Sequence, residues 1–348
     1  IKRVDRRQRK MCIRDRYMNI AFLSELGFNA KVNFLHPKLR TEGMWMFALQ
    51  ANHFNLNDYN SVKGYDAVFI IFPKIGVNLN AVGNEMMGPS PGFDPTIYSK
   101  PVVNTLKNNN EIICVIQEGP HWFFNDYEII TQFNYHNLLS SVDYIFAHNE
   151  CDINFYKGLF PEQKVNIIPS LMCTNNLDSI NPISEQKSII GGNFCRWGGG
   201  FQSYVVASEF EVPIHVIIGH GKRRDEEKIP NLFISKWTMW ENWMKFLSTF
   251  KYAVHLTPTV AAGSFSLNCA WFGIPCIGNE KIDTQRTLHP DLSVDIENIV
   301  HAKELAISLK NDKNFYEKCS NYCKNAVKNS IYSNPQKWKE YMYNILSK

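Results

Sequence analysis

Residues 252–280, YAVHLTPTVAAGSFSLNCAWFGIPCIGNE, decide the fold of this chain. The segment begins with an apolar, strand-like run, continues into small residues at 257–263 and predicts a short helix over 264–272. Gly273 suits the C-cap of that helix, and Pro275 ends it before another short strand. A strand, a small-residue turn and a helix N-terminus together offer unpaired backbone N–H groups to an anion such as phosphate. An ordinary βαβ unit with a tight turn is the alternative reading of the same pattern.

Short apolar runs alternate with helical stretches along almost the whole chain. In the first half, strands are expected at 18–23, 65–72, 111–117, 142–147 and 165–168. In the second half, they are expected at 188–191, 214–218, 232–234, 252–256 and 275–277. Helices are expected between them, for example at 137–141, 153–159 and 204–210. Continuously apolar strands are typical of parallel sheets buried on both faces, so the sequence predicts an α/β fold class with two doubly wound, Rossmann-like domains facing a cleft.

Composition suggests where the domains begin and end. Residues 1–16, IKRVDRRQRKMCIRDR, lack apolar periodicity and resemble translated sequencing-adapter read-through from a metagenomic assembly, so we expect a non-native segment there. A first domain is expected over 17–171, and a polar, proline-containing linker over 172–185. A second domain over 186–330 and a closing C-terminal helix over 331–348 complete the chain.

The charge balance gives no support for a nucleic-acid partner. The chain has 37 Lys and Arg and 33 Asp and Glu residues, a net charge of +4. Eight of the basic and two of the acidic residues lie in 1–16, so the remainder carries 29 and 31, a net charge of −2. No apolar run approaches the roughly 18 residues of a membrane span, and no secretory signal is visible. We therefore expect a cytoplasmic protein with no transmembrane segment, for which peripheral membrane contact is an open alternative.

The cysteines and short motifs exclude several kinds of site. The nine cysteines form no CxxC pair and have no histidine companions at zinc spacing, which predicts buried reduced thiols and no metal site. The sequence also lacks a GxGxxG after its first strand and a GxxxxGK[ST] loop. Dinucleotide-dependent and ATP-dependent enzymes are therefore disfavoured.

Two glycine-rich, basic turns follow strands of the second half. They are GGNFCRWGGG at 191–200 and GHGKRR at 219–224. Ligands of open α/β sheets bind at the carboxyl ends of the strands, where these turns would meet the helix start at Gly263. Backbone N–H groups, hydroxyls and guanidinium groups would then converge as a cradle for a diphosphate. A solvated surface loop is the alternative for the basic run at 222–224.

These turns resemble the donor-binding domain of the GT-B fold glycosyltransferases, particularly the divergent, group 1-like enzymes that use nucleotide sugars. The similarity rests on GNFCR at 192–196, the strand that ends in Gly219, Thr257-Pro258, and AWFGIP at 270–275. More loosely, QEGPH at 117–121 occupies the place where the family often has a histidine after a strand. The family includes many enzymes of bacterial surface-polysaccharide biosynthesis.

The resemblance implies a glycosyltransferase that moves a sugar, hexosyltransferase-like, from a nucleotide-sugar donor to a glycan or other hydroxyl acceptor. Residues 17–171 would form the acceptor side and 186–330 the donor domain, with no essential cofactor or metal. Arg196 is the first candidate to bind the diphosphate, Lys222 or Arg223 the second, and the backbone N–H groups at the helix start the third. The implied donor-binding set is Gly192, Arg196, Gly219, Lys222, Arg223, Gly263, Ser264, Phe265, Ser266 and Asn268.

The sequence departs from the family at one pair of positions. Many retaining members carry two glutamates eight residues apart, and the matching residues here are Val260 and Asn268. Asn268 can hydrogen-bond to a ribose hydroxyl, whereas Val260 cannot. The donor is therefore held differently, or the chain belongs to a divergent branch, or it is a non-catalytic GT-B-shaped module that binds a glycan or a protein. A nucleotide-sugar epimerase is a further alternative.

An inverting enzyme would need a general base for the acceptor hydroxyl. Glu118 and His121, after the strand at 111–117, are the first candidates, and Glu25 is the next. A retaining enzyme would use His121 to orient the donor, and a packed structural histidine is an equal alternative. The tryptophans of WTMWENW at 237–243 share one side of a helix, which favours a role in the core over sugar stacking; Trp237 is the most plausible exposed ring.

Overall fold

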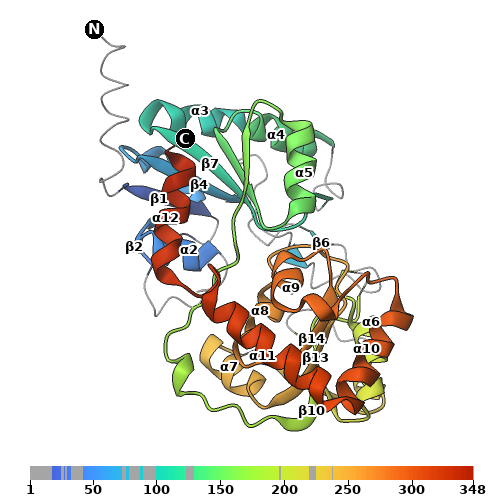
Figure 1. Ribbon diagram of the computed structural model, residues 1–348. Coiled ribbons are helices and arrows are strands. Elements are labelled where there is room, and N and C mark those ends of the chain that lie inside the picture. The colour runs from blue at the N-terminus through green and yellow to red at the C-terminus, as the bar shows by residue number, and fades with distance from the viewer. Residues whose placement is uncertain are drawn as a thin grey trace.

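The structure of the chain is a computed structural model. The first sixteen residues, on which the adapter prediction falls, lie outside the part that it describes. The described residues are 18–24, 27, 30–32, 42–72, 76–77, 87–88, 99–122, 129–195, 197–218, 225–236 and 238–347. They form two sheet-containing halves, with the first half at the top of Figure 1 and the second below it.

The first half contains a seven-stranded sheet in the order β2-β3-β1-β4-β7-β8-β9. Its strands are β1 (Ile20–Ser24), β2 (Ala30–Lys31), β3 (Asn52–Asn55), β4 (Ala67–Phe72), β7 (Ile112–Gln117), β8 (Tyr144–Ala147) and β9 (Lys164–Ile167). Neighbouring strands are parallel, except that β2 runs antiparallel to β3. Short strands β5 (Gly76–Val77) and β6 (Met87–Gly88) form a separate antiparallel pair.

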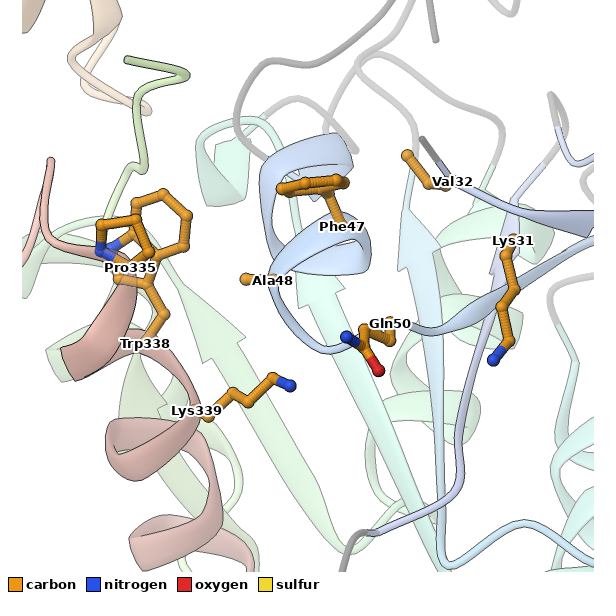
Figure 2. A pocket seen from close by; sticks show the side chains of 8 residues that line it. All are labelled: Lys31, Val32, Phe47, Ala48, Gln50, Pro335, Trp338 and Lys339. Carbon is orange, nitrogen blue, oxygen red and sulfur yellow. The ribbon is translucent and has the colours of Figure 1, made fainter. Parts of the chain in front are cut away.

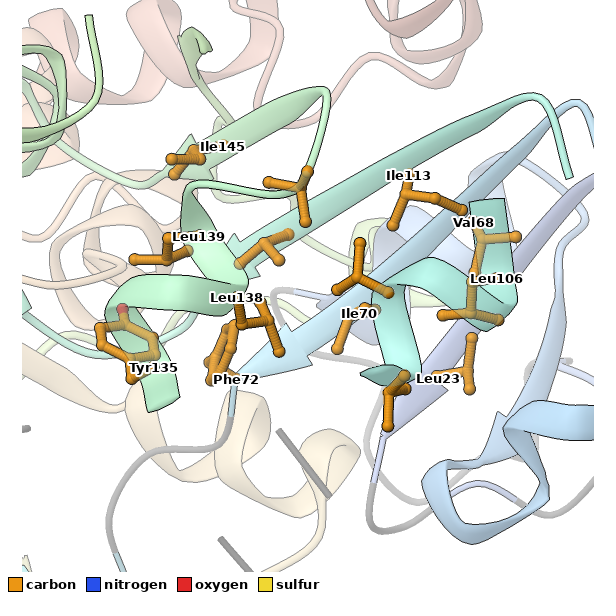
Figure 3. Packing of buried hydrophobic residues seen from close by; sticks show 14 of the residues in the cluster. Leu23, Val68, Ile70, Phe72, Leu106, Ile113, Tyr135, Leu138, Leu139 and Ile145 are labelled. Atoms are coloured by element: carbon orange, nitrogen blue, oxygen red, sulfur yellow. The ribbon is translucent and has the colours of Figure 1, made fainter. Parts of the chain in front are cut away.

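Helices cover both faces of this sheet, as its continuously apolar strands require. One face packs against α3 (Lys100–Asn109), α4 (Ile129–Leu139) and α5 (Glu150–Leu159). Figure 3 shows Leu138 and Tyr135 of α4 over Phe72 of β4 in this layer. The other face packs against α2 (Glu42–Ala48) and α12 (Pro335–Leu346).

The second half contains a six-stranded parallel sheet in the order β12-β11-β10-β13-β14-β15. Its strands are β10 (Glu185–Ile190), β11 (Ile214–Ile218), β12 (Leu232–Lys236), β13 (Phe250–His255), β14 (Cys276–Asn279) and β15 (Ser293–Val294). From β10 the chain adds strands first on one side (β11, β12) and then on the other (β13, β14, β15), so the order of strand addition switches between β10 and β13. Such a topological switch point is where doubly wound sheets usually bind ligands, beyond the carboxyl ends of the strands.

Helices sandwich the second sheet as well. Its helices are α6 (Gly200–Ala207), α7 (Trp240–Leu247), α8 (Ser264–Trp271), α9 (Asp283–Leu288), α10 (Ile299–Asn311) and α11 (Lys313–Asn329). Helices α7 and α8 pack on one face, α6 and α10 on the other. Short 3₁₀ helices are η2 (Leu56–Ser61), η5 (Leu177–Ser179), η6 (Ser208–Phe210), η7 (Glu226–Lys228) and η8 (Pro290–Leu292).

The last helix returns to the first sheet. Helix α11 packs on the second half, whereas α12 lies beside α2 and β1 in the first half (Figure 1). Trp338 and Met342 of α12 are buried together with Trp45 of α2. The hydroxyl of Tyr341 donates a hydrogen bond of 2.7 Å to the carbonyl of Ile167. The C-terminal helix is therefore part of the core of the first half.

The predicted fold class is confirmed, and several element boundaries are corrected. The expected strand at 214–218 matches β11, whereas the helix expected at 137–141 is the end of a longer α4. Strand β3 and helix α2 were not expected, because their polar or glycine-containing sequences carry no strong apolar period. The expected linker at 172–185 holds buried Met172 and Leu177, so it packs against the second half. The domain boundaries themselves remain predictions.

Candidate functional site

The glycine-rich turn after β10 has a fixed backbone that requires its glycines. Gly192 has φ +88°, and a Cβ there would lie 1.9 Å from the carbonyl oxygen of Gly198. Gly199 has φ +66°, and its Cβ would lie 2.0 Å from the carbonyl oxygen of Leu256 at the end of β13. The N–H of Gly200 donates to the carbonyl of Asn193 at 3.0 Å. The turn therefore closes on itself and packs against the neighbouring strand end, which only glycines at these positions allow.

The loop after β13 is tied to that turn. The hydroxyls of Thr257 and Thr259 donate to the carbonyl of Trp197 at 3.0 and 2.6 Å. Gly263 is the N-cap of α8 and packs so closely that a Cβ would lie 1.8 Å from the hydroxyl oxygen of Thr284. The carboxyl ends of β10 and β13 are thus joined into one surface.

The start of α8 offers fewer groups to a ligand than its sequence suggests. The hydroxyl of Ser266 is buried and bonds the carbonyl of Gly263 at 3.2 Å and Thr284 at 3.0 Å. The N–H of Ser264 donates to the carbonyl of Ala262 at 2.9 Å. Asn268 is buried on the same helix, and Phe265 is partly buried. The backbone N–H groups of Phe265 and Ser266 are therefore the better candidates to bind an anion.

Several predicted site residues cannot be placed. Arg196, Gly219, Lys222, Arg223 and Glu25 lie outside the described residues, as does Trp237. Their roles remain predictions from sequence. The other two tryptophans of that stretch are on α7, where Trp243 is buried in the core and Trp240 is partly buried against both halves.

His121 is held by a buried carboxylate that sequence reasoning did not find. It follows β7, and its ring Nδ1 lies 2.6 Å from Oδ1 of Asp152 on the first turn of α5. The side chains are 28% and 3% exposed, respectively. The backbone N–H of His121 donates to the same oxygen at 3.2 Å, and the ring stacks on Phe155 with centroids 4.0 Å apart.

Asp152 is itself fixed by the N-cap of its helix. Asn149 accepts the N–H of Asp152 at 2.9 Å and donates its amide to Oδ2 of Asp152 at 2.7 Å. The carboxylate is thus surrounded by donors, which requires that Nδ1 of His121 carries the proton. In the tautomer with hydrogen on Nδ1 alone, Nε2 is an acceptor, and no described residue hydrogen-bonds to it. Glu118, the other predicted base, directly follows β7 and is partly buried.

Three contacts join the two halves near this dyad. The rings of Trp122 and Trp197 stack with centroids 5.0 Å apart and planes 18° apart. The amide of Asn149 donates to the carbonyl of Val260 at 3.4 Å. Arg286 of α9 forms an ion pair of 3.1 Å with Glu150. Val260 therefore contributes a backbone carbonyl to the contact between the two halves.

His255 is a second residue that the sequence did not single out. It ends β13 beside Gly191, where an added Cβ would lie 2.5 Å from its ring. Its ring also packs on Phe265, with centroids 4.9 Å apart. Burial lowers the pKa of His255 to about 4, so the ring is neutral near pH 7. The neighbouring residues in the sequence are those of an apolar strand, and they do not indicate that His255 lies at the carboxyl edge of the sheet.

A buried histidine behind α8 predicts a pH dependence of stability. Burial lowers the pKa of His289 to about 4, although its Nε2 donates to the carbonyl of Ser266 at 3.0 Å. The unfolded chain, with a histidine pKa of about 6.5, binds more protons between pH 4 and 6.5, so stability rises with pH across this window.

We expect His289→Gln to remove about 2–3 kcal/mol of the stability difference between pH 4.5 and 7.5. Urea unfolding at the two pH values measures this difference. Asn344→Ala on the exposed side of α12 removes no ionisable group, so it is the control that should leave the difference unchanged. An unchanged difference in the His289 variant would show that this residue does not titrate with folding.

A cavity elsewhere in the structure does not involve these residues. It has a volume of about 280 Å³ and lies between α2, β2 and α12 (Figure 2). The residues that line it include the aromatic rings of Phe47 and Trp338 and the side chains of Lys31 and Lys339. Within the described residues, no three His, Cys, Asp or Glu side chains are grouped to hold a metal ion. No described helix is both long and apolar enough to span a bilayer.

The fold resembles several solved structures. HepE of Anabaena, in complex with UDP and glucose, matches with a TM-score of 0.63 at 7% identity over 95% of this chain and 99% of that one. An alpha-glucosyltransferase in complex with UDP matches with a TM-score of 0.59 at 12% identity over 95% and 100%. TarM of S. aureus, in complex with Fondaparinux, alpha-GlcNAc-glycerol and UDP, matches with a TM-score of 0.58 at 12% identity over 84% and 58%. This chain therefore spans little more than half the length of TarM.

The likeness shows the fold, which is the GT-B fold that the sequence predicted. No family model matches the sequence, and no curated protein matches it either. At 7–12% identity, the likeness shows the shared architecture alone and assigns neither a site nor an activity.

Proposed function

We propose that this chain is a glycosyltransferase that moves a sugar from a nucleotide-sugar donor to a hydroxyl acceptor. The observation that carries the proposal is the His121–Asp152 dyad, which sits at a strand end of the first half and next to the contact with the glycine-rich turn of the second. A base on one side of a domain contact and an anion cradle on the other is what sugar transfer from a nucleotide donor needs.

The dyad favours a general-base mechanism over a merely structural histidine. Asp152 holds Nδ1–H of His121, which leaves the Nε2 lone pair to accept the proton of the attacking hydroxyl. The buried carboxylate would also stabilise the imidazolium that forms. Attack by an activated hydroxyl on the anomeric carbon, opposite the leaving diphosphate, inverts that carbon.

UDP is the nucleotide that we expect the donor to carry. HepE, the alpha-glucosyltransferase and TarM have each been solved with UDP. The diphosphate would lie against the turn at Gly192 and the first N–H groups of α8, where helix N-termini favour negative charge. The alpha-glucosyltransferase has also been solved with UDP and a 13-mer DNA. For the present chain, a glycan or another hydroxyl acceptor without nucleic acid remains the proposal.

The proposal is tested by a thermal-shift screen against UDP-, GDP-, ADP- and CMP-sugars, followed by an assay of nucleotide release with hydroxyl acceptors. A donor at 100 times its Kd should stabilise the protein by about 2.7 kcal/mol. Sugar transfer with release of UDP supports the proposal. Stabilisation by glycans without nucleotide release would instead support a non-catalytic binding module, and conversion of one nucleotide sugar to its epimer would support an epimerase.

The diphosphate cradle makes a further prediction at Arg196. A hydrogen bond from a charged donor is worth about 1.5–3 kcal/mol, so Arg196→Ala should weaken UDP binding about 10- to 100-fold. Isothermal titration of UDP measures the loss. Uridine is the control ligand, because it offers Arg196 no charge to neutralise. Equal losses for UDP and uridine, or no loss for UDP, would remove Arg196 from the cradle.

A further inference from the structure

The stacked tryptophans belong to a closed set of contacts that crosses between the two halves twice. In the first half, Trp122 adjoins His121, and Asp152 links His121 to Asn149. The second half is reached by the stack of Trp122 on Trp197 and by the hydrogen bond from Asn149 to Val260.

The two crossing points are also joined within the second half. The carbonyl of Trp197 accepts the hydroxyls of Thr257 and Thr259, which precede Val260 in the same loop. The two contacts that cross between the halves are weak individually, but hydrogen bonds within each half join one to the other. A closed set resists sliding of one half over the other better than separate surface contacts do.

We infer that Trp122 and Trp197 form a positioning pair, which sets the His121–Asp152 dyad against the glycine-rich turn for transfer; this inference rests on the function proposed above. Neither indole needs to touch the substrate. Trp122 directly follows His121, and Trp197 lies in the glycine-rich turn at 191–200. Their stack therefore joins the segment of the proposed base to the turn proposed to bind the diphosphate. A flat ring pair fixes separation and tilt with little side-chain entropy to lose.

Substitution of either tryptophan should lower kcat with little change in the affinity for UDP. Misplacement of a reacting group by about 1 Å costs about 100-fold in rate, so Trp122→Ala and Trp197→Ala should each lower kcat about 10- to 100-fold. The kcat of the double variant should lie within about threefold of the kcat of the slower single variant, because all three variants lose the same contact. Trp122→Phe should recover most of the rate, since a ring can still stack.

Circular dichroism tests the pair without any assay of activity. Two stacked indoles should give an exciton couplet that is lost in either alanine variant. Trp271→Phe is the matched control, because it removes a buried tryptophan whose contacts lie within the core of the second half alone. The control should keep both the couplet and the full kcat.

The outcomes separate this inference from the proposed function. A parent protein that transfers no sugar from any of the four donor classes would overturn the function, and the positioning role with it. An active parent protein whose alanine variants keep their kcat would overturn the pair alone. The same holds if the parent lacks the couplet, or if UDP affinity falls as much as kcat does.

Discussion

Replacement of His121 with alanine is expected to lower kcat for sugar transfer about 100- to 10,000-fold, the range for loss of a positioned general base. The Kd for UDP should change little, because His121 belongs to the first half and the diphosphate cradle to the second. Steady-state rates of UDP release, together with calorimetric titration of UDP, measure the two quantities separately. The variant should also be less stable, because it leaves the buried carboxylate of Asp152 without one donor and Phe155 without its stacking partner, so kcat is compared well below the melting temperature.

Two further variants decide whether His121 acts as the base. Asp152→Asn keeps the shape of the side chain but removes the charge that fixes Nδ1–H, so it should lower kcat in the same direction. Glu118→Gln removes the competing carboxylate and should leave kcat within a few fold. A severe loss in the Glu118 variant, with near-normal transfer by the His121 variant, would reverse the assignment. Loss of UDP affinity in the His121 variant would place this ring at the donor instead.

The sequence predicts the fold where hydrophobicity is continuous and fails where a strand is polar. Strand β4 has the sequence AVFIIF and β7 the sequence IICVIQ. Both are almost entirely apolar, which predicts burial on both faces of the sheet. Strand β3 reads NHFN, and its His53 is buried with Nε2 2.6 Å from the hydroxyl of Ser24 on β1. That hydrogen bond satisfies a polar group inside the sheet, but its two partners are 29 residues apart. Local hydropathy cannot reveal such a pair.

The sequence indicated one member of the candidate dyad, His121, but not its partner Asp152, and the reason is similar. His121 follows an apolar strand, which is enough to make it a candidate base. Its partner Asp152 looks in the sequence like a capping residue, since Asn149 and Asp152 have the spacing of a helix N-cap. The structure shows that the carboxylate of Asp152 accepts hydrogen bonds from both the amide of the N-cap residue Asn149 and the ring of His121. Only the three-dimensional arrangement of the loops after β7 and β8 brings the two residues together.

The second large effect is expected at Trp338, by which the last helix joins the first sheet. Trp338 is 2% exposed, and its indole N–H donates to the carbonyl of Ile331. Trp338→Ala should lower the free energy of unfolding by about 3–5 kcal/mol, because it removes apolar area and leaves a void beside Trp45 and Met342. Urea denaturation followed by circular dichroism measures the loss.

The matched control for Trp338 is Asn344→Ala, on the exposed side of the same helix, which should change stability by no more than about 0.5 kcal/mol. Helix α12 follows α11, whose buried residues belong to the second half, so an undocked α12 would also remove a connection between the halves. We therefore expect transfer activity to fall in the Trp338 variant even at temperatures where it is mostly folded. A loss of stability below about 1 kcal/mol would mean that α12 is not anchored through this ring.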